Sequence, residues 1–360
     1  MTLAHKALIP IMFFHWLGWD ISAVYMSGFA ILLLINQIFN IKQRILSIGI
    51  WSLIVVLIFL AINLSSLIAF KSQFTILLYW YYYCSLFILT FFIAISGRWE
   101  FNELYIAARI IFWIAFYSIA VEFIIVNLFD ISNTVMPAAR LSPAYIGDIN
   151  GLYRPFGLTG QPSVNGGVLM LAYLLLAQIE KTNIKNTFAL LIGSLLTISG
   201  QAILSTFLTL NLIRIAKIKN LYIRVGFLLL LISIILLVLW LDLFQKISLD
   251  YLVYVLWEQS YALETFQLLD ISGILLGTLG EGIPGNVRSE VWVINTIQIY
   301  GVLFFLILWA FVWALLRKTR QPYIYFLCCF LVSLHYPTIF FIEAQLPLIL
   351  IYISCLKFRN

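Results

Sequence analysis

Charge is what this sequence has least of: only 10% of its 360 residues are charged, whereas 63% are hydrophobic. Its mean hydropathy is +1.05. A soluble domain of this length carries far more charge, so the composition excludes that class. It predicts an all-α polytopic membrane protein. The net charge of +6 does not indicate a nucleic-acid partner, because the cations lie between the apolar runs.

Metal-ligand and nucleotide motifs are also missing. The four cysteines lie in apolar runs without metal-site spacing, which predicts reduced, buried residues: Cys84, Cys328, Cys329 and Cys355. The sequence has no Asp-x-Asp pair, no HExxH and no P-loop, so we expect neither a metal, nor ATP, nor another cofactor. A phosphorylated leaving group would then have to be neutralised by arginine.

The apolar runs predict a single transmembrane domain over residues 1–360. By the usual length criterion there are about twelve candidate helices: 7–19, 21–39, 46–62, 74–96, 105–129, 163–180, 187–199, 201–213, 223–241, 291–316, 322–336 and 338–356. The short runs 187–199 and 201–213 meet at Gly200, and cations flank both. We expect them to form a helical hairpin buried among the other spans.

Lysine and arginine set the predicted orientation. Sixteen of the 21 fall on one side of an alternating topology, which makes that side cytoplasmic. The other side holds two loops. Residues 130–162 are the predicted first periplasmic catalytic loop and have no net charge. Residues 242–290 form a second periplasmic loop with a net charge of −5, in which the apolar spacing of residues 249–266 predicts a short amphipathic helix on the membrane surface.

A polar stretch, residues 154–167, interrupts the apolar pattern. Pro162 suits the first turn of a helix. Arg154 then lies just before a helix N-terminus, where free N–H groups and the helix dipole favour an anion. Arg288 has a similar place before another inward-running helix. Two arginines could hold a diphosphate through bidentate contacts. Alternatively, both are interfacial arginines that pair with lipid head groups.

Candidate bases are few. His335 lies at the outer end of a predicted span and could accept a proton from a hydroxyl. Glu343 follows about two turns later and could orient His335 or replace it. Glu281 lies in the flexible glycine-rich run 280–285, which has no strand before it and is therefore no dinucleotide fingerprint. Glu122 is an intramembrane carboxylate, with a functional or a purely structural role.

Residues 105–316 resemble the O-antigen polymerase and ligase superfamily. The resemblance rests on Arg154-Pro-Phe-Gly, then Gln161-Pro-Ser-Val-Asn-Gly opening a span, a short hairpin broken by serine and glycine, a long outer loop, and Arg288-Ser-Glu-Val-Trp before Gly301. It implies a GT-C-like glycosyltransferase that needs no metal and acts at the periplasmic face of the bacterial inner membrane.

The resemblance also implies site residues and partners. It maps the two family arginines onto Arg154 and Arg288 and the ligase histidine onto His335, although the long loop itself has no histidine. The base stays open among His335, Glu343 and Glu281. Further substrate-binding candidates are Arg140, Gly157, Gln161, Asn165 and Tyr336. The partners implied are undecaprenyl-diphosphate-linked oligosaccharide, membrane lipid and a chain-length regulator protein.

We therefore expect a polymerase that joins lipid-linked repeat units into an envelope polysaccharide. Two alternatives stay open. One is a ligase that moves the finished glycan onto lipid A-core. The other is a flippase for lipid-linked oligosaccharide, although the distinctive charges lie in outer loops rather than near the membrane midplane, where transporters place them.

Overall fold

The computed structural model describes residues 50–58, 84–93 apart from 92, 99–129, 148–149, 152–180 apart from 156, 183–226 apart from 219, 221 and 224, 253, 264, 271–277, and 291–357 apart from 335. The regular secondary structure of this part of the chain is helical except for one pair of two-residue antiparallel strands, β1 (Asp148–Ile149) and β2 (Leu152–Tyr153). The described residues include three helices long and apolar enough to cross a membrane. The predicted class, a helical membrane protein, is therefore confirmed, while the number of spans stays a prediction.

The helices follow the predicted apolar runs closely. The long ones are α5 (Phe101–Phe129), α6 (Pro162–Ile179) and α12 (Trp292–Leu316). The shorter ones are α7 (Ile184–Leu196), α8 (Gly200–Ala216), α11 (Ile271–Leu276), α13 (Pro322–Leu331) and α14 (Ile342–Lys357), with a 3₁₀ helix, η4 (Thr338–Phe340). Residues 50–58 and 84–91 are also helical. The predicted spans 7–19 and 21–39, the amphipathic helix 249–266 and most of 223–241 lie outside the described residues.

Local sequence explains where several helices begin. α6 and α13 each begin with proline in the first turn, where the missing N–H leaves no bond unmade. Asn183 caps α7 by accepting a hydrogen bond from the Lys185 N–H at 3.0 Å. Ser199 caps α8 in the same way, accepting from the Ala202 N–H at 3.4 Å. The predicted break between 187–199 and 201–213 is thus confirmed as a capped turn between α7 and α8.

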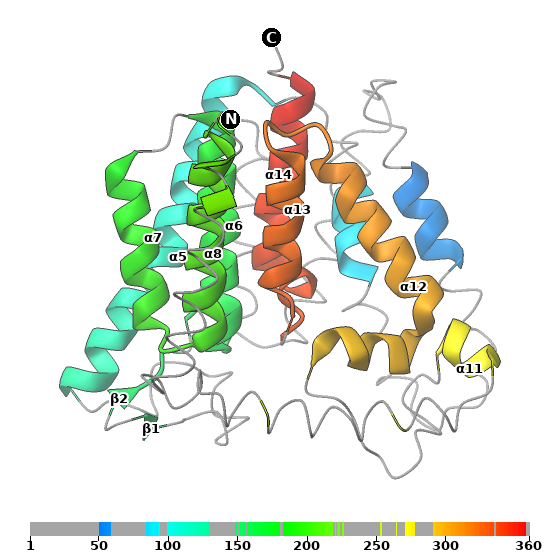
Figure 1. The fold of residues 1–360 in the computed structure, drawn as a ribbon, viewed down its shortest axis with the longest axis horizontal. Coiled ribbons are helices and arrows are strands. Elements are labelled where there is room, and N and C mark those ends of the chain that lie inside the picture. The colour runs from blue at the N-terminus through cyan, green and yellow to red at the C-terminus, as the bar shows by residue number, and fades with distance from the viewer. Residues whose placement is uncertain are drawn as a thin grey trace, which may run out of the picture.

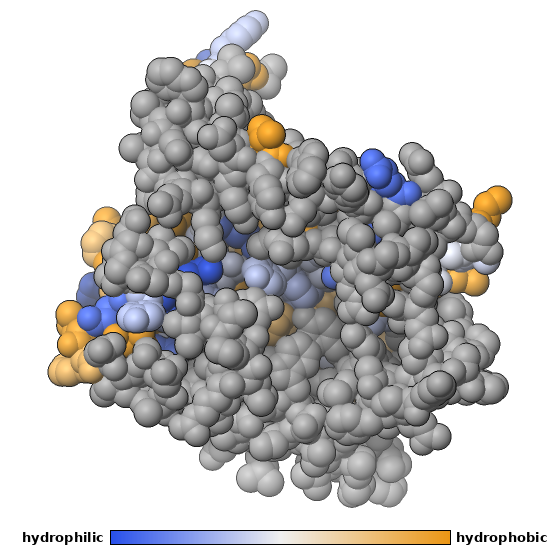
Figure 2. All heavy atoms as spheres, turned by 90° about the horizontal axis from the view of Figure 1, so that it is seen from below, coloured by the Kyte–Doolittle hydropathy of each residue, from blue (hydrophilic) through white to orange (hydrophobic). Residues whose placement is uncertain are grey.

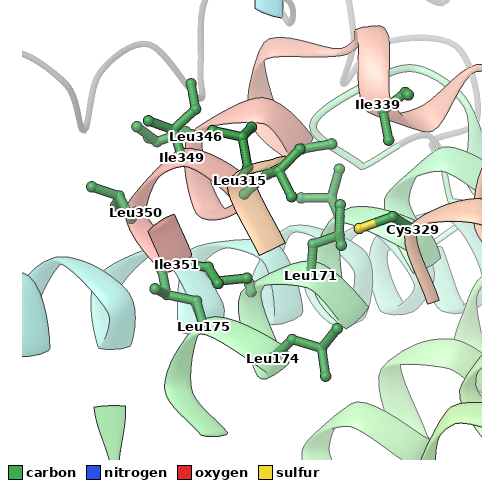
Figure 3. Close-up of a cluster of buried hydrophobic side chains, with 14 of the residues drawn as sticks. Leu171, Leu174, Leu175, Leu315, Cys329, Ile339, Leu346, Ile349, Leu350 and Ile351 are labelled. Carbon is green, nitrogen blue, oxygen red and sulfur yellow. The ribbon is translucent and has the colours of Figure 1, made fainter. Parts of the chain in front are cut away.

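Helix α6 is the centre of the bundle. It packs against α5, α7, α8, α13 and α14, and Figure 1 shows these helices around it. In its most apolar window, 83% of the residues are buried inside the protein, against 33% in α5. Leucines of α6 meet apolar side chains of α12, α13 and α14 in one cluster: Leu171, Leu174, Leu175, Leu315, Cys329, Leu346, Ile349, Leu350 and Ile351 (Figure 3). Since lipid is as apolar as leucine, close packing holds such helices together.

The predicted span 291–316 is not one continuous helix. Gly301, inside α12, has a φ of 81° and a ψ of 166°, so the helix is broken there. Residues 292–300 lie across the lower end of the bundle in Figure 1, and the rest of α12 rises beside α13. Only glycine adopts this conformation readily. A Cβ at Gly301 would also lie 2.2 Å from the Leu275 carbonyl oxygen of α11, so the break and the contact need the same residue.

Two boundaries at the end of the chain also differ from prediction. α13 ends at Leu331, so the run 322–336 is not helical throughout. The run 338–356 begins with the 3₁₀ turn η4, and α14 itself starts at Ile342. All four cysteines are buried thiols, which confirms their predicted burial in apolar surroundings.

Candidate functional site

The N-terminal ends of α6, α8 and α14 meet at one end of the bundle. The Ser163 and Ser199 hydroxyl oxygens, from α6 and the α8 cap, lie 2.8 Å apart in a hydrogen bond. α6 also lies close to η4, the segment before α14. A Cβ at Gly167 would lie 2.6 Å from the Thr338 methyl carbon. Glycine therefore permits the close approach of these two segments.

The first segment of α12 reaches the same end. The Trp292 ring, in the first turn of α12, packs edge-on against Phe340 with 5.2 Å between centroids. Helix N-termini carry unpaired N–H groups and partial positive charge, so their convergence favours anions. Seen from this end, described hydrophilic residues are visible near the middle of the face and also at its left edge, beside hydrophobic ones (Figure 2).

Arg154 lies at this end, in the Arg154 loop (residues 153–161). β2 leads into the loop and α6 follows it. Arg154 itself is partly exposed, whereas Pro155 and the residues from Gly157 to Thr159 are buried. The cation therefore lies in a loop that is packed into the protein on both sides. The predicted position of Arg154 just before a helix N-terminus is confirmed.

Side chains of α5 hold the first part of the Arg154 loop. The Asn127 side-chain oxygen accepts a hydrogen bond from the Tyr153 N–H at 2.7 Å, and its Nδ2 donates to the Tyr153 carbonyl oxygen at 3.0 Å. Glu122 is buried, and its Oε2 accepts from the Gly157 N–H at 2.5 Å. Of the two roles open to Glu122, the structure shows this structural one.

Asn165 of α6 holds the second part. Its Oδ1 accepts from the Thr159 N–H at 3.1 Å and the Thr159 hydroxyl at 3.0 Å. Gly157 has a φ of +58°, and a Cβ there would lie 2.3 Å from the Asn165 Nδ2. The loop thus folds down on the first turn of α6. Gln161 ends the loop as the residue before α6, with its carbonyl oxygen accepting from the Asn165 N–H at 2.9 Å.

A second set of polar contacts fixes the segment between α13 and η4. Gln201 of α8 donates from Nε2 to the Val332 carbonyl oxygen at 2.8 Å. The Thr338 hydroxyl donates to the same oxygen at 2.5 Å. The chain on both sides of position 335 is therefore tied to α8 and to itself. Tyr336, a predicted substrate contact, packs against the hydrophobic core.

Glu343 lies in the first turn of α14 and is fully buried. Neither of its carboxyl oxygens has a hydrogen-bond partner among the residues that the structure describes. Its neighbour two residues on is different: Gln345 donates from Nε2 to the Ser85 hydroxyl at 2.6 Å. Burying a carboxyl group costs free energy unless it is paired.

The structure brings together several of the predicted site residues. Asn165 is hydrogen-bonded to Thr159 and to the Gln161 carbonyl oxygen, and Gly157 packs against the Asn165 side chain, so these residues lie together in and under the loop that carries Arg154. Tyr336 and Glu343 flank η4, which contacts α6. Four predicted residues lie outside the described part of the chain: Arg140, Glu281, Arg288 and His335.

Sequence reasoning missed Asn127 and Thr159. Asn127 had one visible signal, an amide in the last turn of an otherwise apolar span, where a polar side chain needs a partner. Thr159 had none, because threonine in a loop is common.

The fold and these contacts define a helical membrane protein in which several helix N-termini and hydrogen-bonded polar side chains lie at one end. Comparison with known proteins assigns no family: no family model, no curated protein and no solved structure matches the chain.

Proposed function

We propose that this protein is a metal-independent glycosyltransferase that polymerises lipid-linked repeat units at the periplasmic face of the bacterial inner membrane. The observation that carries the proposal is the placement of Arg154. The loop that holds it is hydrogen-bonded to α5 and α6, at the end of the bundle where several helices begin. An arginine carried by a loop that is held at a helix N-terminus is suited to a diphosphate.

In the proposed reaction, a hydroxyl of one repeat unit attacks the anomeric carbon of a glycan on undecaprenyl diphosphate. The new glycosidic C–O bond forms as the bond to the diphosphate breaks, and undecaprenyl diphosphate leaves with the electron pair. Arg154 and Arg288 stabilise the charge that develops on it. The hydroxyl proton passes to a base, for which His335, Glu343 and Glu281 are the candidates.

The charge of the second loop favours a polymerase over a ligase. Residues 242–290 have a net charge of −5 and would repel the phosphate-rich lipid A-core that a ligase accepts. A polymerase acceptor brings only its own diphosphate, which few arginines can serve.

The test is the envelope polysaccharide profile of a strain from which the gene is deleted. Loss of a polymerase leaves single repeat units on lipid A-core and no ladder of longer chains. Long chains that accumulate on undecaprenyl diphosphate would instead identify a ligase. Repeat units trapped on the cytoplasmic face would identify a flippase. Either result would overturn the proposal.

The proposed topology is tested separately with single cysteines and a membrane-impermeant thiol reagent. A cysteine at Ser142, in the first predicted periplasmic loop, should react from outside the inner membrane. A cysteine at Tyr222 is the control, because this position is 86% exposed and lies between predicted cytoplasmic cations. Labelling at Tyr222 with protection at Ser142 would put Arg154 on the wrong side for this reaction.

A further inference from the structure

The chain on both sides of Arg154 is bound to α5. Tyr153, the residue before Arg154, exchanges two hydrogen bonds with the Asn127 amide, at 2.7 and 3.0 Å. Gly157, three residues after Arg154, donates its N–H to the Glu122 carboxyl group at 2.5 Å. α5 thus fixes the backbone at both ends of the short segment that carries the arginine.

The two contacts have different geometries. The Asn127 amide pairs with both the N–H and the C=O of one residue, as a neighbouring strand would, and so fixes the rotation of that backbone as well as its position. The same Nδ2 also donates to the Phe123 carbonyl oxygen at 2.9 Å, which holds the amide against its own helix. Glu122 supplies a single bond at the other end. Together they leave the Arg154 backbone little freedom.

Polar side chains within a membrane helix are costly unless they are paired. α5 is otherwise apolar in its last two turns, and its outward side chains, such as Val121 and Leu128, are exposed as lipid-facing residues would be. Glu122 and Asn127 interrupt this pattern, and both bind main chain flanking the same cation. The bonds from Glu122 and Asn127 are not needed merely to attach the loop to the bundle, because Asn165 already ties the loop to α6.

From this geometry we infer that Asn127 and Glu122 are positioning residues, which hold Arg154 where it meets a lipid-linked diphosphate. The inference rests on the proposed function, because it takes Arg154 to be the diphosphate ligand. Neither residue touches the substrate in this scheme. Both act through the backbone of the Arg154 loop.

The experiment uses the full chain in lipid nanodiscs with undecaprenyl diphosphate as the probe. Dissociation constants are measured for the native protein and for Asn127→Ala, Glu122→Ala, Glu122→Gln and Arg154→Ala. Amide hydrogen exchange at Tyr153 and Gly157 is followed in the same samples. Asn211→Ala is the matched control, because the Asn211 amide in α8 donates to its own helix at the Phe207 carbonyl oxygen, at 2.8 Å.

Asn127→Ala should speed amide exchange at Tyr153, and Glu122→Ala should speed it at Gly157. Each variant should also weaken binding of undecaprenyl diphosphate about 10-fold or more, because a displaced Arg154 loses one hydrogen bond to the charged diphosphate. Glu122→Gln keeps an acceptor oxygen and should retain most of the affinity. Asn211→Ala should change neither measurement. In an Arg154→Ala background, Asn127→Ala should weaken binding no further, because it acts only through Arg154.

The outcomes separate the two claims. Unchanged amide exchange in both alanine variants would show that Asn127 and Glu122 do not restrain the loop backbone. Faster exchange with native affinity, or an additive loss in the Arg154→Ala background, would overturn the positioning role while leaving Arg154 as a ligand. If Arg154→Ala itself binds undecaprenyl diphosphate like the native protein, the proposed function fails, and the positioning role fails with it.

Discussion

The Arg154 loop and the start of α14 lie at the same end of the bundle, but their buried polar groups differ. In the loop, the N–H groups of Tyr153, Gly157 and Thr159 each donate to a side-chain oxygen of α5 or α6. At the start of α14, the fully buried Glu343 carboxyl has no hydrogen-bond partner among the described residues. The hydrogen bonds of the first region fix its backbone, whereas the acidic group of the second region has no partner among the described residues.

Because of this difference, substitutions in the two regions should have different effects on stability. Satisfied buried groups contribute to folding, and removing one partner strands the other at a cost of about 1–3 kcal/mol. An unsatisfied buried carboxyl lowers stability, so substitution by an apolar side chain should be tolerated by the fold. The following predictions test this contrast, beginning with the largest expected effect.

The largest effect is expected at Arg154 itself. Arg154→Ala should slow polymerisation by roughly 100- to 1000-fold, or about 3–4 kcal/mol, as for other lost charge-stabilising donors. Arg154→Lys should fail nearly as badly, because a point charge cannot reproduce the guanidinium fork. The rate is measured as incorporation of labelled sugar into high-mass polysaccharide in the deletion strain.

Expression must be equal in these strains, and activity should persist in excess EDTA if no metal takes part. Arg288→Ala and Arg288→Lys should behave like their Arg154 counterparts. Native rates in Arg154→Ala would show that the rigid loop serves the fold alone, and the contrast with α14 would lose its functional meaning.

The next prediction compares alanine substitutions at two glycines of the loop. Gly157 and Gly160 both have positive φ, +58° and +72°, so alanine is strained at either. At Gly157 a Cβ would also lie 2.3 Å from the Asn165 side chain, whereas at Gly160 nothing lies within 4 Å. Gly160→Ala should cost about 1–2 kcal/mol from backbone strain. Gly157→Ala should cost about 2–4 kcal/mol, because overpacking adds to that strain.

Thermal unfolding of both variants in detergent gives the comparison. Equal losses for Gly157→Ala and Gly160→Ala would show that the loop can move away from α6, and that its rigidity is smaller than the hydrogen bonds indicate.

A third pair of variants compares the two regions directly. Glu343→Met removes a buried carboxyl that has no partner among the described residues, so stability should be unchanged or higher, while polymerisation should fall if Glu343 serves the chemistry. Asn165→Leu removes the acceptor for Thr159 and should cost about 1–3 kcal/mol. A marked loss of stability in Glu343→Met would mean that this carboxyl is bound within the folded protein.

Parts of this arrangement could be predicted from the sequence, because they depend on local rules. Pro162 marks the start of α6, and Ser199 with Gly200 marks the break between α7 and α8. The kink at Gly301 could not be predicted, because the run 291–316 is long and apolar enough for one span and a glycine inside it is compatible with a straight helix.

The hydrogen bonds from α5 to the Arg154 loop could not be predicted for a different reason. Glu122 and Gly157 lie 35 residues apart, and Asn127 and Tyr153 lie 26 apart. Periodicity shows that α5 is a span, but not which of its faces meets the loop. The same limit applies to Glu343: its position in an apolar run made it a candidate, while its lack of a described partner depends on how α14 packs.

The smallest effect is expected where the end of the Arg154 loop meets the hairpin. The Ser163 and Ser199 hydroxyls share one hydrogen bond of 2.8 Å, but Ser199 also caps α8, so Ser199→Ala alone removes two interactions. A double-mutant cycle with Ser163→Ala isolates the pair, for which we expect a coupling of about 0.5–1.5 kcal/mol. Stability is read from thermal unfolding of the two single variants and the double variant in the same detergent. A coupling near zero would mean that packing, rather than this hydrogen bond, holds α6 and α8 together at Gly166, where a Cβ would lie 2.2 Å from the Ala202 Cβ. The buried hydrogen bonds that contribute to stability would then end at the Arg154 loop.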